Sequence, residues 1–256
     1  MKVKPFSVLL GLFAGALAGF LYVIFLVERF SQQKEPKIYI LTRTSGRPEF
    51  FKACRKSILE QSYKNWEHIV SYDDVETFKY VSAAGDGVVP VGVDKLIKTP
   101  EMNCPYNLYN NNLLKRVPNG GWVLFLDDDG KLYNKDSLKV LSKQIIKAEK
   151  EEKELIISLG DGKVNKKPNC WGMDRDEIMK RMKKGGEDWH FAKIDTSHIC
   201  IQKTDKLEPW RYRCAGDAHF FDDNLKAGYE PFYNENVVIS GNYLRYGSGK
   251  GKDISY

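Results

Sequence analysis

The most constraining feature of this 256-residue sequence is an apolar run that ends in three aspartates. Residues 122–126 read WVLFL, and a turn signal at residues 118–121 precedes them. A continuous apolar run of this length is typical of a strand buried on both faces, as in a parallel sheet flanked by helices. Asp127, Asp128 and Asp129 follow at the carboxyl end of the run, where α/β sheets bind their ligands. The run therefore predicts both a fold class and the place of a site.

Strand-like runs alternate with helical patterns along the chain. Strands are expected at residues 37–42, 66–72, 87–93, 122–126 and 155–159, and helices at residues 48–61, 75–83, 107–116 and 136–152. Alternation of this kind predicts an α/β domain with a mostly parallel sheet.

The amino-terminal region is expected to anchor the chain in a membrane. Residues 6–27 form an uncharged apolar run, long enough to cross a hydrocarbon core of about 30 Å. A cleavable signal peptide is the alternative, because residues 14–18 (AGALA) are small. The run stays apolar to residue 27, which favours an uncleaved transmembrane helix. Lys2 and Lys4 before it predict a type II orientation, with the rest of the chain across the membrane. Residues 1–5 are then a tail, 28–36 a linker and 37–256 one domain.

Charge and cysteine patterns exclude two classes of protein. The 40 basic and 34 acidic residues are mixed along the chain, whereas a nucleic-acid binder more often shows one dense basic stripe. The five cysteines include no CxxC pair and no histidine at ligand spacing, which argues against a zinc site. We therefore expect neither nucleic acid nor zinc as a partner.

The three aspartates need a counter-charge, because adjacent, partly buried carboxylates repel one another. A divalent cation, Mn²⁺ or Mg²⁺, would satisfy them, since hard cations prefer oxygen ligands. Such a cation would also neutralise the phosphates of a leaving diphosphate. An aspartate-rich surface turn is the plainer alternative.

Two blocks of sequence resemble the GT-A glycosyltransferases, particularly the family 2 type with its DXD motif. These blocks are residues 40–74 (ILTRTSGRPEFFKACRKSILEQSYKNWEHIVSYDD) and residues 104–130 (CPYNLYNNNLLKRVPNGGWVLFLDDDG). The resemblance implies a GT-A-like α/β/α glycosyltransferase domain over residues 37–256. It also implies transfer of a sugar, with inversion, from a nucleoside-diphosphate sugar to a hydroxyl of a glycan, lipid or protein acceptor.

On the donor side, the resemblance places Thr42 and Arg47 in the nucleotide pocket. Asp73 or Asp74 would accept a hydrogen bond from the base, although capping of the following helix is an alternative role for this pair.

Within the DXD motif, the resemblance makes Asp129 the principal metal ligand. Asp127 would lie nearest the ribose or the metal, and Asp128 would occupy the variable middle position on the donor side.

On the acceptor side, Gly216-Asp217 is similar to the place where inverting family 2 enzymes keep their catalytic acidic residue. Asp217 would then be the general base, with capping of the next helix as the alternative and Asp222 and Asp223 as fallbacks. The segment IDTS, residues 194–197, resembles an acceptor-side segment and makes Asp195 a candidate.

Two further side chains have an ordinary structural explanation as well as a functional one. Trp210 would stack on a sugar ring or belong to the core, and His219 would complete the metal shell or serve structure.

Two other functions stay open at this point. A nucleotidyltransferase also uses carboxylates and a metal, but more often shows a glycine-rich basic loop, of which residues 45–47 (SGR) are a poor version. A non-catalytic carbohydrate-binding membrane protein with a degenerate transferase fold is the second. Intact aspartates at positions 127, 129 and 217 argue against such decay.

Overall fold

The computed structural model describes residues 35–158, 196–234 and 239–242. The chain divides into two units, Met1–Glu35 and Pro36–Tyr256, and every element described below belongs to the second. Within the described ranges, no helix has both the length and the apolar character needed to cross a membrane. The anchor predicted at residues 6–27 lies outside the described residues.

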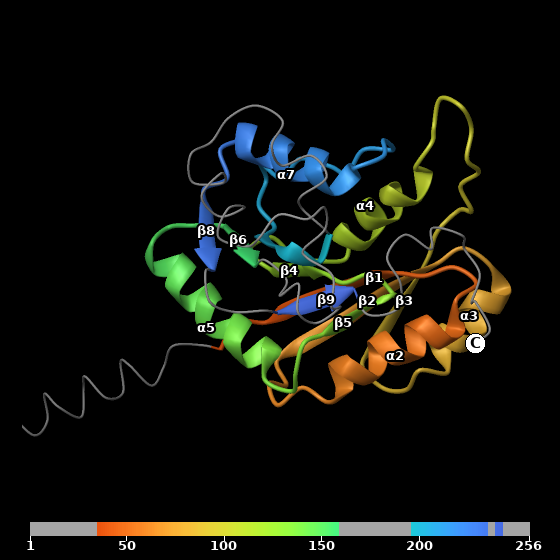
Figure 1. The fold of residues 1–256 in the computed structure, drawn as a ribbon, viewed down its shortest axis with the longest axis horizontal. Coiled ribbons are helices and arrows are strands. Elements are labelled where there is room, and N and C mark those ends of the chain that lie inside the picture. Colours follow the sequence, from red (N-terminus) through yellow and green to blue (C-terminus); the bar gives the residue numbers. More distant parts are fainter. Residues whose placement is uncertain (1–34, 159–195, 235–238, 243–256) are drawn as a thin grey trace, which may run out of the picture. The chain divides into compact units, whose positions relative to one another are not determined.

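A seven-stranded sheet forms the centre of the domain, with strand order β3-β2-β1-β4-β7-β6-β8 (Figure 1). Its strands are β1 (Ile38–Arg43), β2 (Trp66–Tyr72), β3 (Val88–Gly92), β4 (Trp122–Phe125), β6 (Leu155–Ser158), β7 (Ile199–Gln202) and β8 (Pro231–Asn234). Neighbouring strands are parallel except that β7 runs antiparallel to both β4 and β6. The short strands β5 (Gly130–Leu132) and β9 (Ser240–Asn242) pair separately.

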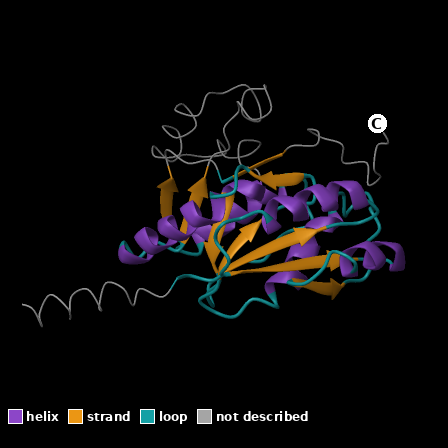
Figure 2. Cartoon of the chain, turned by 90° about the horizontal axis from the view of Figure 1, so that it is seen from below, coloured by secondary structure: helices purple, strands orange, loops and turns teal. Residues whose placement is uncertain are grey.

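Helices cover both faces of this sheet, and Figure 2 shows them running alongside the strands. The helical elements are α2 (Pro48–Leu59), α3 (Val75–Ser82), η1 (Pro105–Leu108), α4 (Tyr109–Leu114), α5 (Ser137–Lys150), η2 (Thr196–His198) and α7 (Gly216–Lys226). Helices α4 and α7 lie on one face, and α2 and α5 lie on the other (Figure 1).

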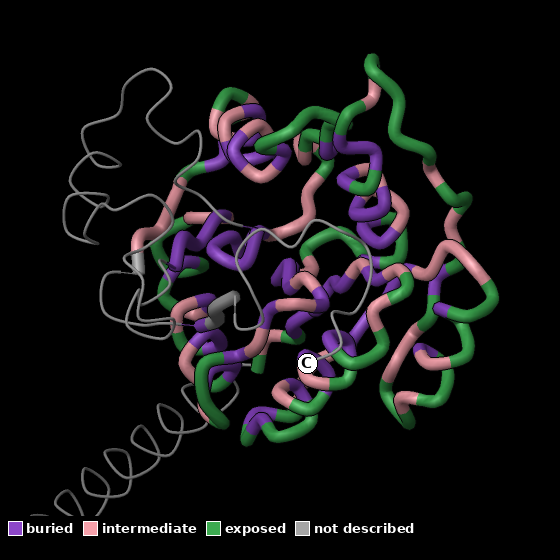
Figure 3. The backbone as a smooth tube through the Cα atoms, turned by 45° about the vertical axis from the view of Figure 1, so that its right-hand side comes forward, coloured by how far each residue is buried: buried purple, intermediate pink, exposed green. Residues whose placement is uncertain are grey.

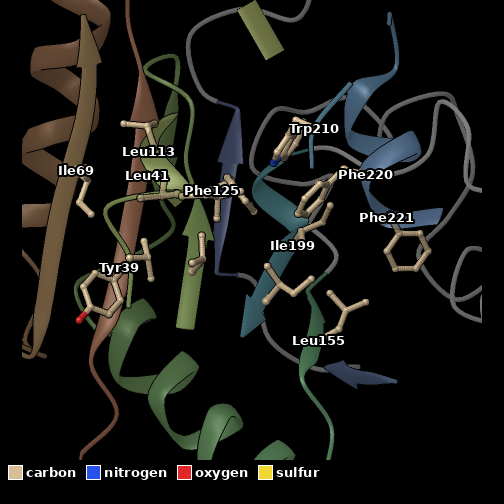
Figure 4. Close-up of a cluster of buried hydrophobic side chains, with 14 of the residues drawn as sticks. Tyr39, Leu41, Ile69, Leu113, Phe125, Leu155, Ile199, Trp210, Phe220 and Phe221 are labelled. Atoms are coloured by element: carbon tan, nitrogen blue, oxygen red, sulfur yellow. The ribbon is translucent and has the colours of Figure 1, made fainter. Parts of the chain in front are cut away.

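Alternating residues of β1 show how the chain builds two cores. Tyr39 and Leu41 pack in the core beneath α4 and α7, while Ile38 and Ile40 pack in the core beneath α2 and α5. This alternation follows from the twofold side-chain period of a strand. Figure 4 shows the first core in close-up, and Figure 3 shows buried and exposed residues alternating along the helices.

The structure confirms the predicted α/β class, with a mostly parallel sheet that matches the GT-A-like arrangement expected from the resemblance. The five strands expected before residue 160 are all present, and the helix expected at residues 107–116 occurs as η1 followed by α4. Strands β5, β7, β8 and β9 were not expected. They have three or four residues each, too few for a periodic pattern to be read.

Candidate functional site

A cavity of about 180 Å³ lies at the carboxyl ends of the central strands β1 and β4. It is lined by Arg43, Asp127, Asp129, Gly130, Thr196, Ser197 and Asp217. Three of the carboxylates singled out in the sequence therefore meet in one place, although 88 residues separate Asp129 from Asp217 along the chain, by their numbers.

Strand direction explains why these segments converge. Arg43 ends β1, and Asp127 lies two residues beyond β4, which is parallel to β1, so both reach the same edge of the sheet. Strand β7 is antiparallel to β4, so the residues before β7, Thr196 and Ser197, arrive at that same edge. Asp217 is added by the first turn of α7.

Arg43 forms a two-point ion pair with Asp127. Its Nε and Nη2 atoms donate to Asp127 Oδ1 and Oδ2 at 2.8 and 2.9 Å. The side chains are only 15% and 25% exposed, so water screens the pair weakly. Burial alone would raise the pKa of Asp127, but Arg43 outweighs it and the pKa lies below its usual value. Asp127 is therefore held as a carboxylate at the wall of the cavity.

Arg47 makes the corresponding pair with Asp128. Its Nε donates to Asp128 Oδ2 at 3.0 Å, a second bond joins Nη2 to Oδ1, and its Nη1 lies 3.5 Å from Asp129 Oδ2. Asp128 is fully buried, and burial raises its pKa to about 7 although Arg47 opposes the rise. Neither Arg47 nor Asp128 lines the described cavity. The two arginines thus supply counter-charge that sequence reasoning assigned to a metal alone.

Thr42 corrects one expectation about the nucleotide pocket. Its side chain is fully buried, and its hydroxyl donates to the backbone oxygen of Leu126 at 2.7 Å. The same hydroxyl lies 2.9 Å from Nε2 of His68, whose pKa is held well below its usual value by burial and by nearby Arg55. Thr42 joins β1 to the end of β4 from inside the core and does not reach the cavity.

The structure separates the two aspartates after β2. Asp74 caps α3, accepting from the backbone N–H of Thr77 at 2.7 Å, and it pairs with Lys95 at 3.0 Å. The backbone hydrogen bond from Thr77 is the main reason that the pKa of Asp74 is lowered. Asp73 accepts from the Tyr109 hydroxyl through Oδ2, while its buried Oδ1 has no hydrogen-bond partner. Asp73 is therefore the carboxylate with acceptor capacity left for a ligand.

Asp217 does not cap α7, so that alternative is wrong. The residue at the cap is Ala215, with a left-handed backbone at φ 56°, and Asp217 lies in the first turn. Its Oδ1 accepts from the N–H of Ala218 at 2.9 Å, and a carboxylate is favoured there by the helix dipole. The fallbacks pair elsewhere, Asp222 with Lys226 and Asp223 with Arg211, and neither lines the cavity.

The remaining acceptor-side candidates divide three ways. Trp210 is 2% exposed, stacks on Phe220 at 4.5 Å between ring centroids and packs edge-on against Phe125 (Figure 4), so it cannot stack on a sugar. His219 is half-buried in α7 and is not part of the cavity lining. Asp195 lies outside the described residues.

Sequence reasoning missed Arg43, Thr196 and Ser197. Arg43 stands in the block that suggested the fold, and Thr196 and Ser197 stand in the IDTS segment. These two segments were recognised in the sequence. Nothing in the sequence showed that β7 runs antiparallel to β4, which is what brings Thr196 and Ser197 to the cavity. Thr196 adds a side-chain hydrogen bond that favours ionised Asp127.

The donor set of the cavity suits a hard cation shared with a ligand. All of its acidic and hydroxyl groups offer oxygen, and Mg²⁺ is commonly held by one or two carboxylates together with substrate phosphates. Among the described residues, no group of three His, Cys, Asp or Glu side chains is arranged to hold a metal by itself. Asp129 and Asp127 fit the shared type of site.

Comparison with known proteins gives a likeness of fold. No family model matches the sequence, and no curated protein matches it. The structure is similar to S. aureus TarS, with a TM-score of 0.56 and 12% identity over 80% of this chain and 36% of that one. For residues 1–349 of TarS in complex with UDP-GlcNAc, the TM-score is 0.56 and the sequence identity 14%, over 86% of this chain and 62% of that one. For the complex of the same TarS residues with UDP, the TM-score is 0.51 and the identity 12%, over 80% of this chain and 59% of that one. This chain thus spans between about a third and two thirds of the TarS chains.

We expect Arg43→Gln to lower the free energy of unfolding by about 1.5–3 kcal/mol, because it leaves the partly buried Asp127 carboxylate without its charged hydrogen-bond donor. The double variant Arg43→Gln/Asp127→Asn should recover much of that loss, since a neutral amide replaces the stranded charge. Urea unfolding of the parent, both single variants and the double variant measures this coupling. If the losses of unfolding free energy in the two single variants simply add in the double variant, the ion pair between Arg43 and Asp127 is contradicted.

Proposed function

We propose that this protein is a metal-dependent glycosyltransferase that moves a sugar from a nucleoside-diphosphate sugar to an acceptor hydroxyl, with inversion at the anomeric carbon. The observation that supports it most is the meeting of Asp127, Asp129 and Asp217 in one cavity at the carboxyl edge of the sheet. The fold is like that of TarS, which has been crystallised with UDP-GlcNAc and with UDP. A UDP-sugar is therefore the first donor to test.

The donor would bind along the edge formed by β1, β2 and β4. The Oδ1 of Asp73, which is buried without a hydrogen-bond partner, would accept from a ring N–H of the base, while Tyr109 holds the other carboxylate oxygen. The diphosphate would lie near Asp129, with Mn²⁺ or Mg²⁺ between them. When bound, the cation neutralises charge that develops on the departing diphosphate. Arg43 keeps Asp127 ionised and in place throughout.

Asp217 would act on the other side of the sugar. Its carboxylate accepts the proton of the acceptor hydroxyl as the acceptor oxygen bonds to the anomeric carbon and the bond to the diphosphate breaks. Attack from the face opposite the leaving group inverts the configuration. The acceptor is a hydroxyl of a glycan, a lipid or a protein.

The nucleotidyltransferase alternative finds no comparable support. Its phosphate loop would be residues 45–47, but the Gly46 N–H donates to the Thr77 hydroxyl at 3.1 Å, and the Arg47 guanidinium is bound to Asp128. These groups serve the protein itself and do not form a phosphate cradle.

We expect Asp129→Ala to abolish metal-dependent donor binding while leaving the fold intact, since it removes one of several mutually repelling carboxylates. Titration calorimetry with UDP-GlcNAc and other UDP-sugars, with MnCl₂ or with EDTA, measures this effect. Asp205→Ala is the matched control, because Asp205 is exposed and hydrogen bonds to Asn119 instead. Equal donor affinity in parent and Asp129→Ala would remove the metal assignment.

Asp217→Asn should keep donor binding and lose turnover, because an amide cannot take the acceptor's proton at neutral pH. General-base assistance is worth about 10²–10⁴-fold, so the loss should appear in kcat. Asparagine can still accept from the Ala218 N–H, so the helix should be retained. Steady-state kinetics of Asp217→Asn, compared with those of Asp222→Asn and Asp223→Asn, check the assignment of Asp217 as the general base. Near-normal turnover by Asp217→Asn would move the base to another residue.

We further propose that residues 6–27 anchor the chain and that the domain lies on the far side of the membrane. A disulfide between Cys104 and Cys214 supports this placement, because such bonds persist in oxidising compartments. Carbonate extraction of membranes should leave the full chain in the pellet, and sequencing of the mature protein should find its first residues. Release by carbonate, or a mature terminus near residue 19, would show a cleaved signal peptide instead.

A further inference from the structure

The segment that leads to Asp217 is fastened to the segment around η1 and α4 at several points. Cys214 is bonded to Cys104, and the N–H of Cys104 donates to the backbone oxygen of Tyr212 at 3.0 Å. Further along, in α4, Asn111 exchanges two hydrogen bonds with the backbone of Trp210, at 2.8 and 2.9 Å. The short stretch before α7 therefore follows the position of η1 and α4.

Asn107 differs from Cys104 and Asn111 because it also contacts Arg43, which lines the cavity. Its Oδ1 accepts from Arg43 Nη1 at 2.6 Å, and its Nδ2 donates to the backbone oxygen of Arg213 at 2.8 Å. The residue is only 5% exposed. The other two guanidinium nitrogens of Arg43 donate to Asp127. One amide thus links the pair that holds Asp127 to the backbone four residues before Asp217.

Gly216 provides an independent sign that this contact is tight. A Cβ at Gly216 would lie 2.2 Å from Asn107 Nδ2 and 2.8 Å from its Cγ, well inside contact distance. The side chain of Asn107 cannot easily swing aside, because both ends of its amide are hydrogen bonded. The close packing of Asn107 against the backbone therefore explains the glycine next to Asp217.

We propose that Asn107 is a positioning residue, which sets the distance between the Asp217 carboxylate and the donor side of the cavity. The inference rests on the proposed function, because it assigns Asp217 as the base. Arg43 fixes one end of the amide and the Arg213 carbonyl fixes the other, so a shift of Asn107 moves the base relative to the donor. Misplacement by about 1 Å can cost about 10²-fold in rate.

The test is a double-mutant cycle between Asn107→Ala and Gly216→Ala in the full chain, with UDP-GlcNAc, other UDP-sugars and MnCl₂. Gly216→Ala in the parent should lower kcat by roughly 10- to 100-fold and leave the donor Kd unchanged. In the Asn107→Ala background, adding Gly216→Ala should cost little more, because the obstructing amide is gone. Additive losses would overturn the proposal.

Two further variants keep the test decisive if Gly216→Ala folds poorly. Asn107→Asp preserves shape and the acceptor toward Arg43, but it places an oxygen against the Arg213 carbonyl, so kcat should fall as well. Asn111→Ala is the matched control, since it removes an amide bridge to the same segment without touching Arg43. An equal kcat loss in Asn111→Ala would show a general anchoring effect and overturn the specific role of Asn107.

Hydrogen exchange measured by mass spectrometry separates this inference from the proposed function. Asn107→Ala and Gly216→Ala should each speed exchange at residues 212–219 and leave α5 unchanged. If the chain turns over no nucleoside-diphosphate sugar, the proposed function fails. Faster exchange at residues 212–219 in the variants would still support the link between Asn107 and this segment. Unchanged exchange at residues 212–219 would overturn the positioning role.

Discussion

The ion pair between Arg43 and Asp127 is the interaction on which the arrangement of the site depends. It joins the ends of the two central parallel strands, and it holds the pKa of Asp127 below its usual value although burial alone would raise that pKa. The third nitrogen of Arg43, Nη1, donates to Asn107, whose amide in turn donates to the backbone before Asp217. One guanidinium therefore contributes to the position of groups on both sides of the cavity.

The three consecutive aspartates have different environments because a strand end turns successive side chains in different directions. Asp127 and Asp129 line the cavity, while Asp128 points into the protein and meets Arg47. All three carboxylates lie within ion-pair distance of an arginine, Asp127 beside Arg43 and the other two beside Arg47, but only Asp127 and Asp129 also face the cavity. The two guanidinium groups explain how so much negative charge is tolerated at the end of a buried strand.

The sequence was sufficient to predict the central strands, the class of fold and the three carboxylates that meet. Long apolar runs such as WVLFL carry a strong signal, and the carboxyl edge of a parallel sheet is a known meeting place. Arg43, Thr196 and Ser197 were missed because their proximity to Asp127 depends on pairing between strands. Thr42 was misplaced for a related reason, and for Trp210 the core was one of the two roles expected. Position in a motif does not reveal whether a side chain points to the core, and both are buried.

The disulfide between Cys104 and Cys214 gives the site an order of assembly. The two cysteines are separated by 110 residues, a span that contains β4, β5, β6 and β7, and only α7, β8 and β9 follow Cys214 among the described elements. A chain emerging from its amino terminus therefore completes most of the central sheet before the second cysteine is available. In chain-entropy terms, closing a loop of this size restricts the unfolded chain by on the order of 4–5 kcal/mol. The disulfide can therefore form only after most of the central sheet has been synthesised, and it then ties the approach to Asp217 to the residue before η1.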